Sequence, residues 1–263
     1  MMGFDFGAVD ARDYDELRPT YAPEAIAWVA ERAGLEPGST VIDLAAGTGQ
    51  LSRRFAAIGC RVIAVEPAAN MRSVMQDKAP EVTVLAGTAE RIPVEDGTAD
   101  AVVVGNAFHH FDADRAAEQI RRVLRHGGAL ALFWARSDEA LGPALPGDSS
   151  VVAEDRATIS VTREIERAVE RVRGTSEFID AYRSWYEPRP VEGFSPFERR
   201  FFPIAHAIPS DRVADLYATS SDIASLPPDA RGELLARIAH LAADLPETFE
   251  LRARSDVMLS FRT

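Results

Sequence analysis

One short stretch of the chain combines an acid with glycines in a pattern that could bind a small ligand. Asp43 ends a run of apolar residues, and a turn of small residues containing Gly47 and Gly49 follows it. Glycine lets the backbone approach a ligand closely and adopt conformations that a side chain disfavours. A helix predicted at residues 51–58 would point its free N–H groups at whatever occupies the turn. This stretch is therefore the strongest candidate ligand site in the sequence.

Glu66 supplies the second half of this candidate site. It ends the next predicted strand, 17 residues after Gly49, where an acid can accept hydrogen bonds from both hydroxyls of a ribose. The dinucleotide pattern G-x-G-x-x-G is not completed, because Ser52 stands where the third glycine would be. Asp43 is unfavourable beside a pyrophosphate but suits the cationic amino group of a methionine moiety. Together these features favour S-adenosylmethionine over NAD as the cofactor.

Two adjacent histidines, His109 and His110, follow the fourth predicted strand, at the edge where ligands bind in doubly wound sheets. An imidazole with an ordinary pKa is a suitable general base at neutral pH. Adjacent residues of an extended chain point in opposite directions, so we expect one histidine to face the site, with His110 as the candidate base. The alternative is that both histidines only shape the site. Asp112 is predicted to cap the next helix, and no metal site is predicted.

The elements that must position these residues alternate along the chain. Continuous apolar runs predict strands at residues 41–45, 61–65, 82–85, 101–105 and 129–134, with helices between them at 51–58, 68–77 and 115–124. Strands that are apolar throughout are typical of a parallel sheet covered on both faces. The predicted fold class is therefore α/β, with a doubly wound sheet.

The remaining segments predict a lid and the far edge of the sheet. Further elements are predicted as mostly helix at 151–186, a strand at 197–207, helices at 210–218 and 229–245, and a last strand or hairpin at 249–261. The expected organisation is an N-terminal helical lid at 1–35, a cofactor-binding core at 36–136, a substrate lid at 137–195 and completion of the sheet at 196–263.

Composition narrows the class of partner. The 263 residues include 41 acidic and 29 basic side chains, a net charge of −12. Nucleic-acid binding usually needs a basic surplus, so we expect no nucleic acid partner, and no membrane partner for the same reason. No apolar run is long enough for a transmembrane helix and no signal peptide is recognised, so cytoplasmic residence is expected. Cys60 is the single cysteine, which excludes an intrachain disulfide and a cysteine-based zinc site.

The motifs resemble those of the class I methyltransferases, in the broad small-molecule group often called type 11. Five segments match in order: Tyr14 with Arg18-Pro19-Thr20-Tyr21, Asp43 to Gly49, Val65-Glu66-Pro67, Gly87 to Pro93, and Asn106 to Phe111. The resemblance covers about residues 14–134 and continues more loosely through residues 220–226. It departs from the commonest family turn at Ala45, where that turn has glycine.

The resemblance implies a Rossmann-like, doubly wound seven-stranded sheet, mostly parallel with an antiparallel last strand, plus a helical lid. It also implies roles for residues around S-adenosylmethionine. The methionine part would be lined by Asp43, Ala45 and Gly47, with Gly49 in the same turn, and the ribose would be bound by Glu66. The adenine would pack on Pro67 and Met71 and be bordered at its edge by Thr88, Ala89 and Glu90. The sulfonium would lie above Asn106 and Ala107. Tyr14, Arg18 and Tyr21 would sit on the lid, with Arg18 paired to the methionine carboxylate. Simple packing of the N-terminal helix is the alternative for the two tyrosines.

The implied reaction is transfer of a methyl group to an oxygen, nitrogen or carbon nucleophile of a small-molecule substrate, with secondary metabolites among the candidates. Trp134, Phe178 and Tyr182, together with Tyr21, are candidate substrate contacts, and ordinary packing is the alternative. The segment Asn106 to His109 lacks the prolines of the N-P-P-Y motif found in enzymes that methylate exocyclic amino groups of nucleobases. The alternative function is cofactor-assisted cyclisation or rearrangement on the same fold. The oligomeric state is not specified by the sequence.

Overall fold

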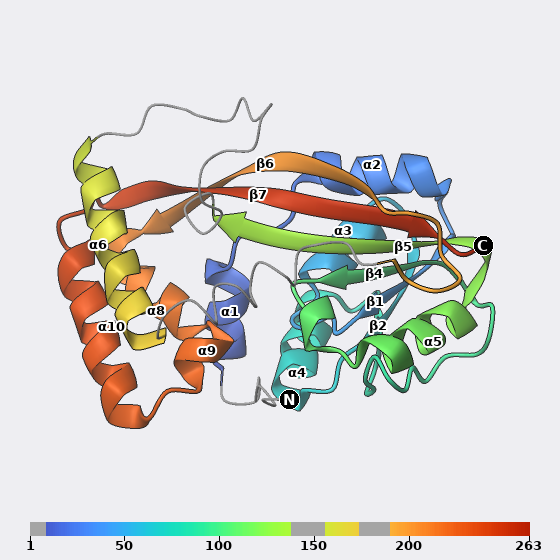
Figure 1. Cartoon of the computed structure of the whole chain (residues 1–263), viewed down its shortest axis with the longest axis horizontal. Helices are drawn as coiled ribbons and strands as arrows, with labels where there is room; N and C mark the ends of the chain where they lie inside the picture. The colour runs from blue at the N-terminus through green and yellow to red at the C-terminus, as the bar shows by residue number, and fades with distance from the viewer. Residues whose placement is uncertain (1–8, 138–155, 174–189) are drawn as a thin grey trace. The chain divides into compact units, whose positions relative to one another are not determined.

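The computed structural model describes residues 9–137, 156–173 and 190–263 (Figure 1). The chain divides into two compact units. Of the described residues, the sheet unit contains 19–137, 190–204 and 253–263, and the helical unit contains 9–18, 156–173 and 205–252.

A seven-stranded sheet forms the framework of the sheet unit, in the order β3-β2-β1-β4-β5-β7-β6, so that β3 and β6 are its edges. The first five strands pair in parallel, and β7 pairs antiparallel with β5. The strands are β1 Thr40–Leu44, β2 Arg61–Val65, β3 Thr83–Leu85, β4 Ala99–Gly105, β5 Leu124–Ser137, β6 Glu198–Pro209 and β7 Thr248–Phe261. The predicted α/β, doubly wound fold with an antiparallel last strand is confirmed.

Helices α2 and α5 lie on opposite faces of this sheet (Figure 1). α2 begins with Pro23, whose missing N–H needs no partner in a first turn, and ends at Gly34 in the left-handed conformation. α5 is capped by Asp112, as predicted, because its carboxylate accepts a hydrogen bond from the Arg115 N–H at 3.3 Å. The helices of the sheet unit are α2 Pro23–Ala33, α3 Gln50–Ala57, α4 Ala69–Lys78 and α5 Ala113–Val123.

The helical unit has a hydrophobic core of its own. It is formed by side chains of α6, α8, α9 and α10 and of the end of β6, among them Ile165, Val169, Ile208, Ile223, Leu234 and Ile238. The helices are α1 Ala11–Leu17, α6 Arg156–Arg173, α8 Val213–Ala218, α9 Ser221–Ala224 and α10 Pro228–Ala242. α1 is joined to this unit by an ion pair of 2.6 Å between Arg212 and Asp13. None of the helices in the described parts of the chain combines the length and apolar character needed to cross a membrane.

The two units follow different boundaries from the four segments expected from the sequence. In the described part of this N-terminal segment, residues 9–35, there are two helices, and the second, α2, belongs to the sheet unit because Ile26, Trp28 and Val29 are buried in its core. Residues 205–252 belong to the helical unit, since α8 to α10 bury their apolar faces against α6.

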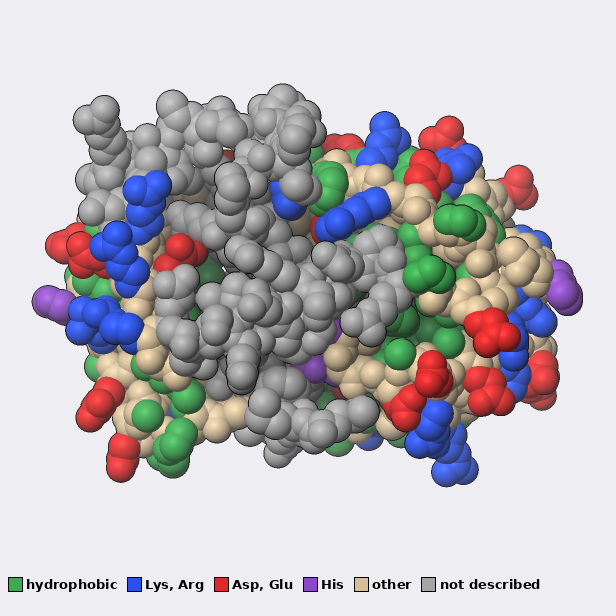
Figure 2. Space-filling model, viewed as in Figure 1, with side chains coloured by type: hydrophobic (Ala, Val, Ile, Leu, Met, Phe, Trp, Pro, Cys, Tyr) green, Lys and Arg blue, Asp and Glu red, His purple; other side chains and the backbone are tan. Residues whose placement is uncertain are grey.

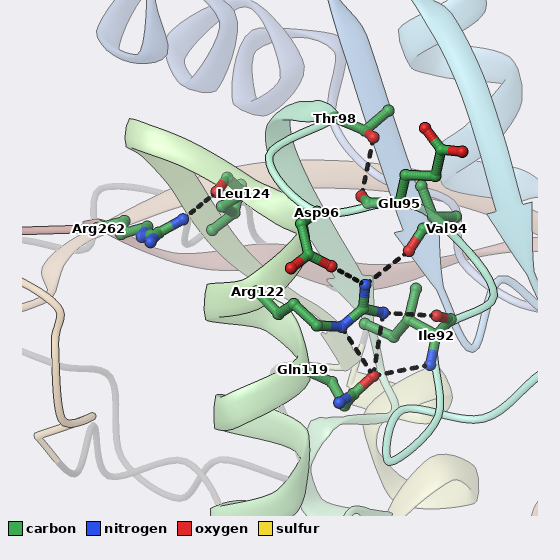
Figure 3. A network of polar contacts seen from close by, with 9 residues as sticks. All are labelled: Ile92, Val94, Glu95, Asp96, Thr98, Gln119, Arg122, Leu124 and Arg262. Atoms are coloured by element: carbon green, nitrogen blue, oxygen red, sulfur yellow. Dashed lines mark hydrogen bonds and ion pairs between the residues drawn. The ribbon is translucent and has the colours of Figure 1, made fainter.

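A polar network around Arg122 fixes the connection between β3 and β4 (Figure 3). The Arg122 guanidinium, on α5, donates to the carbonyl oxygens of Ile92 at 2.7 Å and Val94 at 2.8 Å, and pairs with Asp96 at 2.6 Å. The Gln119 side chain, one turn earlier, accepts a bond from the Ile92 N–H at 3.3 Å. The connection that follows residues 88–90 is therefore fastened to a rigid helix.

Candidate functional site

The candidate site lies where the sheet order reverses, at the carboxyl ends of β1, β2 and β4, which is where ligands bind in doubly wound sheets. Two non-glycine residues in the described ranges have positive φ angles: Ala45, with φ 54°, directly after β1, and Asn106, with φ 52°, directly after β4. Such conformations are rare outside glycine and gather at functional sites. Both therefore support the position that the sequence predicted for the site.

The two glycines of the turn after β1 are required for different reasons. Gly47 has φ 57°, and a Cβ added to it would meet no atom within 4 Å. Gly49 has φ 84° and begins α3, but a Cβ there would lie 2.6 Å from Cγ of Met75. Gly47 therefore faces open space at the candidate site, whereas Gly49 is required by packing against α4.

This contrast gives the first testable expectation. Gly47→Ala should fold with a penalty of about 1 kcal/mol for its left-handed conformation and should weaken ligand binding by occupying the open space. Gly49→Ala should be the more destabilised protein, because Met75 must move. Thermal unfolding and calorimetric titration of both variants measure the difference, and equal effects of the two on both readouts would contradict this assignment.

Asp43 is almost completely buried at the end of β1. The hydroxyl of Ser52, in the first turn of α3, donates to its Oδ2 at 2.6 Å, and the Ser52 backbone N–H is a second donor. Burial nevertheless raises the pKa of Asp43 from 3.8 to about 7, with a smaller contribution from the charge of Glu66. A cation placed beside Asp43 would favour its ionised form and lower this pKa. From the sequence, Ser52 was expected only to interrupt a dinucleotide pattern; a serine at the start of the helix that follows an acid and a glycine turn is the signal that could have identified it as a partner of Asp43.

Glu66 ties the end of β2 to the glycine turn. Its Oε2 accepts a hydrogen bond from the Gly47 N–H at 2.9 Å, and its Oε1 accepts one from the Ala68 N–H at 2.8 Å. Burial raises the pKa of Glu66, and the two backbone N–H groups and Arg72 oppose this rise. Each carboxylate oxygen can accept a further bond, so the geometry is compatible with ribose hydroxyls. Arg72 was not anticipated; it donates to the main-chain oxygens of Glu66 at 2.9 Å and Pro67 at 2.7 Å.

The other residues predicted to surround the cofactor occupy the same edge. Met71 and Ala89 are buried, whereas Pro67 and Thr88 are exposed. Glu90 accepts a hydrogen bond from the Asp112 N–H at 3.0 Å and so links the loop after β3 to α5. Ala107 follows Asn106 and leads into the next turn. The contacts of these residues with a cofactor stay predictions.

The arrangement predicted for the two histidines is wrong. Phe108–His110 form a turn of 3-10 helix instead of extended chain, so adjacent side chains do not point to opposite sides. The rings of His109 and His110 instead lie together, with centroids 3.9 Å apart. Burial lowers the pKa of His109 to about 3, with a smaller effect of His110, and burial also lowers the pKa of His110. Both imidazoles are therefore neutral at pH 7, and His110 is the less perturbed candidate for a base.

Tyr21 and Trp134 are both buried in the sheet unit. Tyr21 packs edge-on against Phe133 with ring centroids 5.5 Å apart, and its hydroxyl oxygen would lie 2.3 Å from a Cβ at Gly105. The Tyr21 hydroxyl therefore sits directly over the end of β4. Trp134 lies near the end of β5 in register with Asp256 of β7. Phe178 and Tyr182 lie outside the described residues.

Tyr14 and Arg18 belong to the helical unit. The Arg18 guanidinium donates to the hydroxyls of Thr219 and Ser220, both at 2.8 Å, and lies 5.6 Å from the centre of the Tyr14 ring. These contacts use two of the N–H groups of Arg18. Its pairing with the methionine carboxylate stays a prediction. Among the described residues, no three histidine, cysteine or acidic side chains come together as a metal site.

Comparison with known proteins gives the family of this fold. Residues 42–132 match the family of methyltransferase domains, a range that includes the glycine turn, Glu66 and both histidines. Residues 42–132 are therefore a methyltransferase domain. An uncharacterized methyltransferase of Mycobacterium tuberculosis is 44% identical to this chain over 142 residues, which are 54% of this chain and 56% of that protein. The match thus spans about half the length of this relative.

Two further comparisons extend beyond the methyltransferase domain. An uncharacterized methyltransferase of Schizosaccharomyces pombe is 27% identical over 247 residues, 94% of this chain and 90% of that protein. The solved structure of a protein assigned as a type II methyltransferase from Anaeromyxobacter dehalogenans superposes with a TM-score of 0.64 at 22% identity, covering 94% of this chain and 97% of that chain. The fold is therefore shared over nearly the whole chain.

Proposed function

We propose that this protein is an S-adenosylmethionine-dependent methyltransferase that moves a methyl group to a nucleophile of a small molecule. The observation that carries the proposal is the buried acid pair around the glycine turn: Asp43 at the end of β1 and Glu66 at the end of β2. These residues fit the cofactor, because Asp43 suits a cationic amino group, Glu66 suits ribose hydroxyls, and a Cβ on Gly47 would meet no atom within 4 Å.

When bound, the cofactor would supply a methyl group that is already activated. The chain would then orient the two reactants, and orientation alone can contribute roughly 7–11 kcal/mol to a reaction of this kind. The neutral imidazole of His110 would accept a proton where the acceptor must lose one. A small-molecule acceptor is supported by the net charge of −12 and by Figure 2, where acidic and basic side chains of the described residues are interspersed on the visible face.

Calorimetric titration with S-adenosylmethionine, S-adenosylhomocysteine and NAD tests the cofactor. We expect micromolar binding of the two sulfur ligands and none of NAD. Glu66→Ala should lower the affinity about tenfold to a hundredfold, because charge-assisted hydrogen bonds contribute about 1.5–3 kcal/mol each. Glu118→Ala, at an exposed position of α5, is the matched control and should bind as the wild type does. If the folded wild-type protein binds neither sulfur ligand at millimolar concentration, the proposal fails.

A further inference from the structure

Asn106 continues the sheet with its side chain at the point where β4 ends. The register of β4 and β5 ends at Gly105 and Phe133, so the next pair would be Asn106 and Trp134. In a parallel ladder, a residue at this place donates its N–H to the residue before its partner and accepts, through its main-chain oxygen, from the residue after it. The Asn106 N–H does donate to the Phe133 oxygen at 2.8 Å. The Ala135 N–H, however, donates at 3.0 Å to the side-chain Oδ1 of Asn106.

The side-chain oxygen thus replaces the main-chain oxygen of the same residue. The main-chain oxygen is replaced because the backbone of Asn106 is left-handed, with φ 52°, and turns the chain out of the strand. The orientation of the amide follows directly, because only its oxygen can accept from the Ala135 N–H. The NH2 group, on the same carbon atom, therefore presents its donors at the carboxyl edge of β4 and β5.

We infer that the Asn106 amide selects a methyl acceptor that is a negatively charged oxygen nucleophile, such as a carboxylate or phenolate, and disfavours an amine. This inference rests on the proposed function. An oxyanion has several lone pairs, so it can accept a hydrogen bond from Asn106 and still attack. An amine has one lone pair, which it needs for attack, and its own N–H groups would face the Asn106 donors. Asp43 lies at the end of β1 and Glu66 directly after β2, whereas Asn106 follows β4 and bonds to β5. The hydrogen-bond donors of the Asn106 amide therefore lie on the β4 and β5 side of the site, where we place the acceptor.

For an acceptor that is already ionised, such as a carboxylate, the implied step balances without a proton transfer; a phenol first gives its proton to a base, the role proposed for His110. A lone pair of the acceptor oxygen forms a bond to the methyl carbon while the carbon–sulfur bond breaks, and that electron pair stays on sulfur. The positive sulfonium and the negative oxygen become a neutral thioether and a neutral ester or ether. No oxidant, reductant or further reactant is needed.

Two variants separate the donor function from the structural one. Asn106→Asp keeps the shape of the side chain, the oxygen that accepts from Ala135 and a tolerance for the left-handed conformation, but replaces the donors by a second acceptor. Asn106→Gly keeps the backbone conformation and removes the side chain. Wild type and variants are assayed for S-adenosylhomocysteine production with phenol against aniline and benzoate against benzylamine. We expect the oxygen acceptors to be preferred by the wild type, and Asn106→Asp to lower their turnover at least tenfold and to shift the preference towards the amines.

A second measurement does not depend on finding a substrate. Nitrogen-15 NMR of the complex with S-adenosylhomocysteine follows the side-chain NH2 resonances of Asn106, which are assigned by their loss in Asn106→Asp. The complex is titrated separately with sodium acetate, methylammonium chloride and sodium chloride. Acetate alone should shift them. Preferred methylation of the amines, or no specific response of these resonances to acetate, would overturn the inference. If S-adenosylhomocysteine binds and acetate has no effect, only this inference fails; if S-adenosylhomocysteine does not bind, the proposed function fails first.

Discussion

Asp43→Asn is expected to abolish measurable cofactor binding at micromolar concentration while making the protein without its cofactor more stable above pH 7. The asparagine oxygen can still accept the 2.6 Å bond from Ser52, so the turn should keep its shape. The variant lacks the negative charge that we propose to pair with the amino group of the cofactor. Removing one partner of a buried ion pair costs about 3–5 kcal/mol, which corresponds to a loss of affinity of at least about 100-fold.

The gain in stability follows from the pKa of Asp43, which burial raises from 3.8 to about 7. Below pH 3.8 this carboxyl group is protonated in both the folded and the unfolded protein. As the pH rises from 3.8 to about 7, the unfolded state ionises first, so the wild type loses stability through this window and the loss is complete above about pH 7. The asparagine variant does not titrate and should show no such loss. For the wild type, cofactor affinity should also fall as the pH drops below about 7, because the ionised form is the one that binds the cation.

Thermal unfolding at pH 5 and pH 8, with calorimetric titration of S-adenosylmethionine at both, measures these effects. Asp244→Asn, at an exposed position after α10, is the control and should change neither quantity. A variant that binds the cofactor as tightly as the wild type, or that gains no stability at pH 8 relative to pH 5, would contradict the role assigned to Asp43.

Gly105→Ala should be the most destabilising of the small substitutions considered. A Cβ at this position would lie 2.3 Å from the Tyr21 hydroxyl oxygen and 2.8 Å from Cδ1 of Leu51. Overpacking a close-packed core typically costs 1–3 kcal/mol, and we expect about 3 kcal/mol here because two side chains crowd the position and pairing with Phe133 of β5 restricts how far the backbone can shift. For a protein of this size, the melting temperature should fall by roughly 6–12 °C.

Two companion variants test the cause of this loss. In a Tyr21→Phe background, which removes the nearest clashing atom, the penalty of Gly105→Ala should be smaller. Gly232→Ala, in α10, meets no atom within 4 Å and should be neutral or stabilising, because alanine is the better helix former. Unfolding curves of five proteins suffice: the wild type, the Gly105→Ala, Tyr21→Phe and Gly232→Ala variants, and the double variant. An undiminished penalty in the Tyr21→Phe background would show that the Tyr21 hydroxyl does not rest over β4 as described.

Much of the fold was predictable because its signals are local. The apolar runs that form β1, β2 and β4, and the breaks at glycine between them, have the period and composition of buried parallel strands. The position of Asp43 and Glu66 at strand ends followed from the same pattern. The resemblance to class I methyltransferases then supplied the antiparallel last strand, which the isolated segment at 249–261 could only suggest.

The features that escaped prediction depend on contacts between distant residues or on a local change of conformation. The close approach of the His109 and His110 rings could not be predicted without knowing that the chain enters a 3-10 turn after Asn106. The sequence alone did not distinguish why glycine is needed at position 47 from why it is needed at position 49. The distinction depends on the position of Met75, which lies close to Gly49 and not to Gly47. At Asn106, the side-chain oxygen accepts the hydrogen bond that the main-chain oxygen would accept in a continuous strand. Its donor is Ala135, 29 residues away, and no spacing rule in the sequence indicates this contact.

The two edges of the sheet also bear on how the protein behaves when it is concentrated. An edge strand offers unpaired backbone groups that can recruit a strand from another molecule and start an aggregate. β3 has only three residues, which is too short for extensive pairing. β6 is longer, but Pro203 in its middle lacks the N–H that a continuous ladder needs. The same sheet that carries the site thus protects the folded protein against edge-to-edge polymerisation.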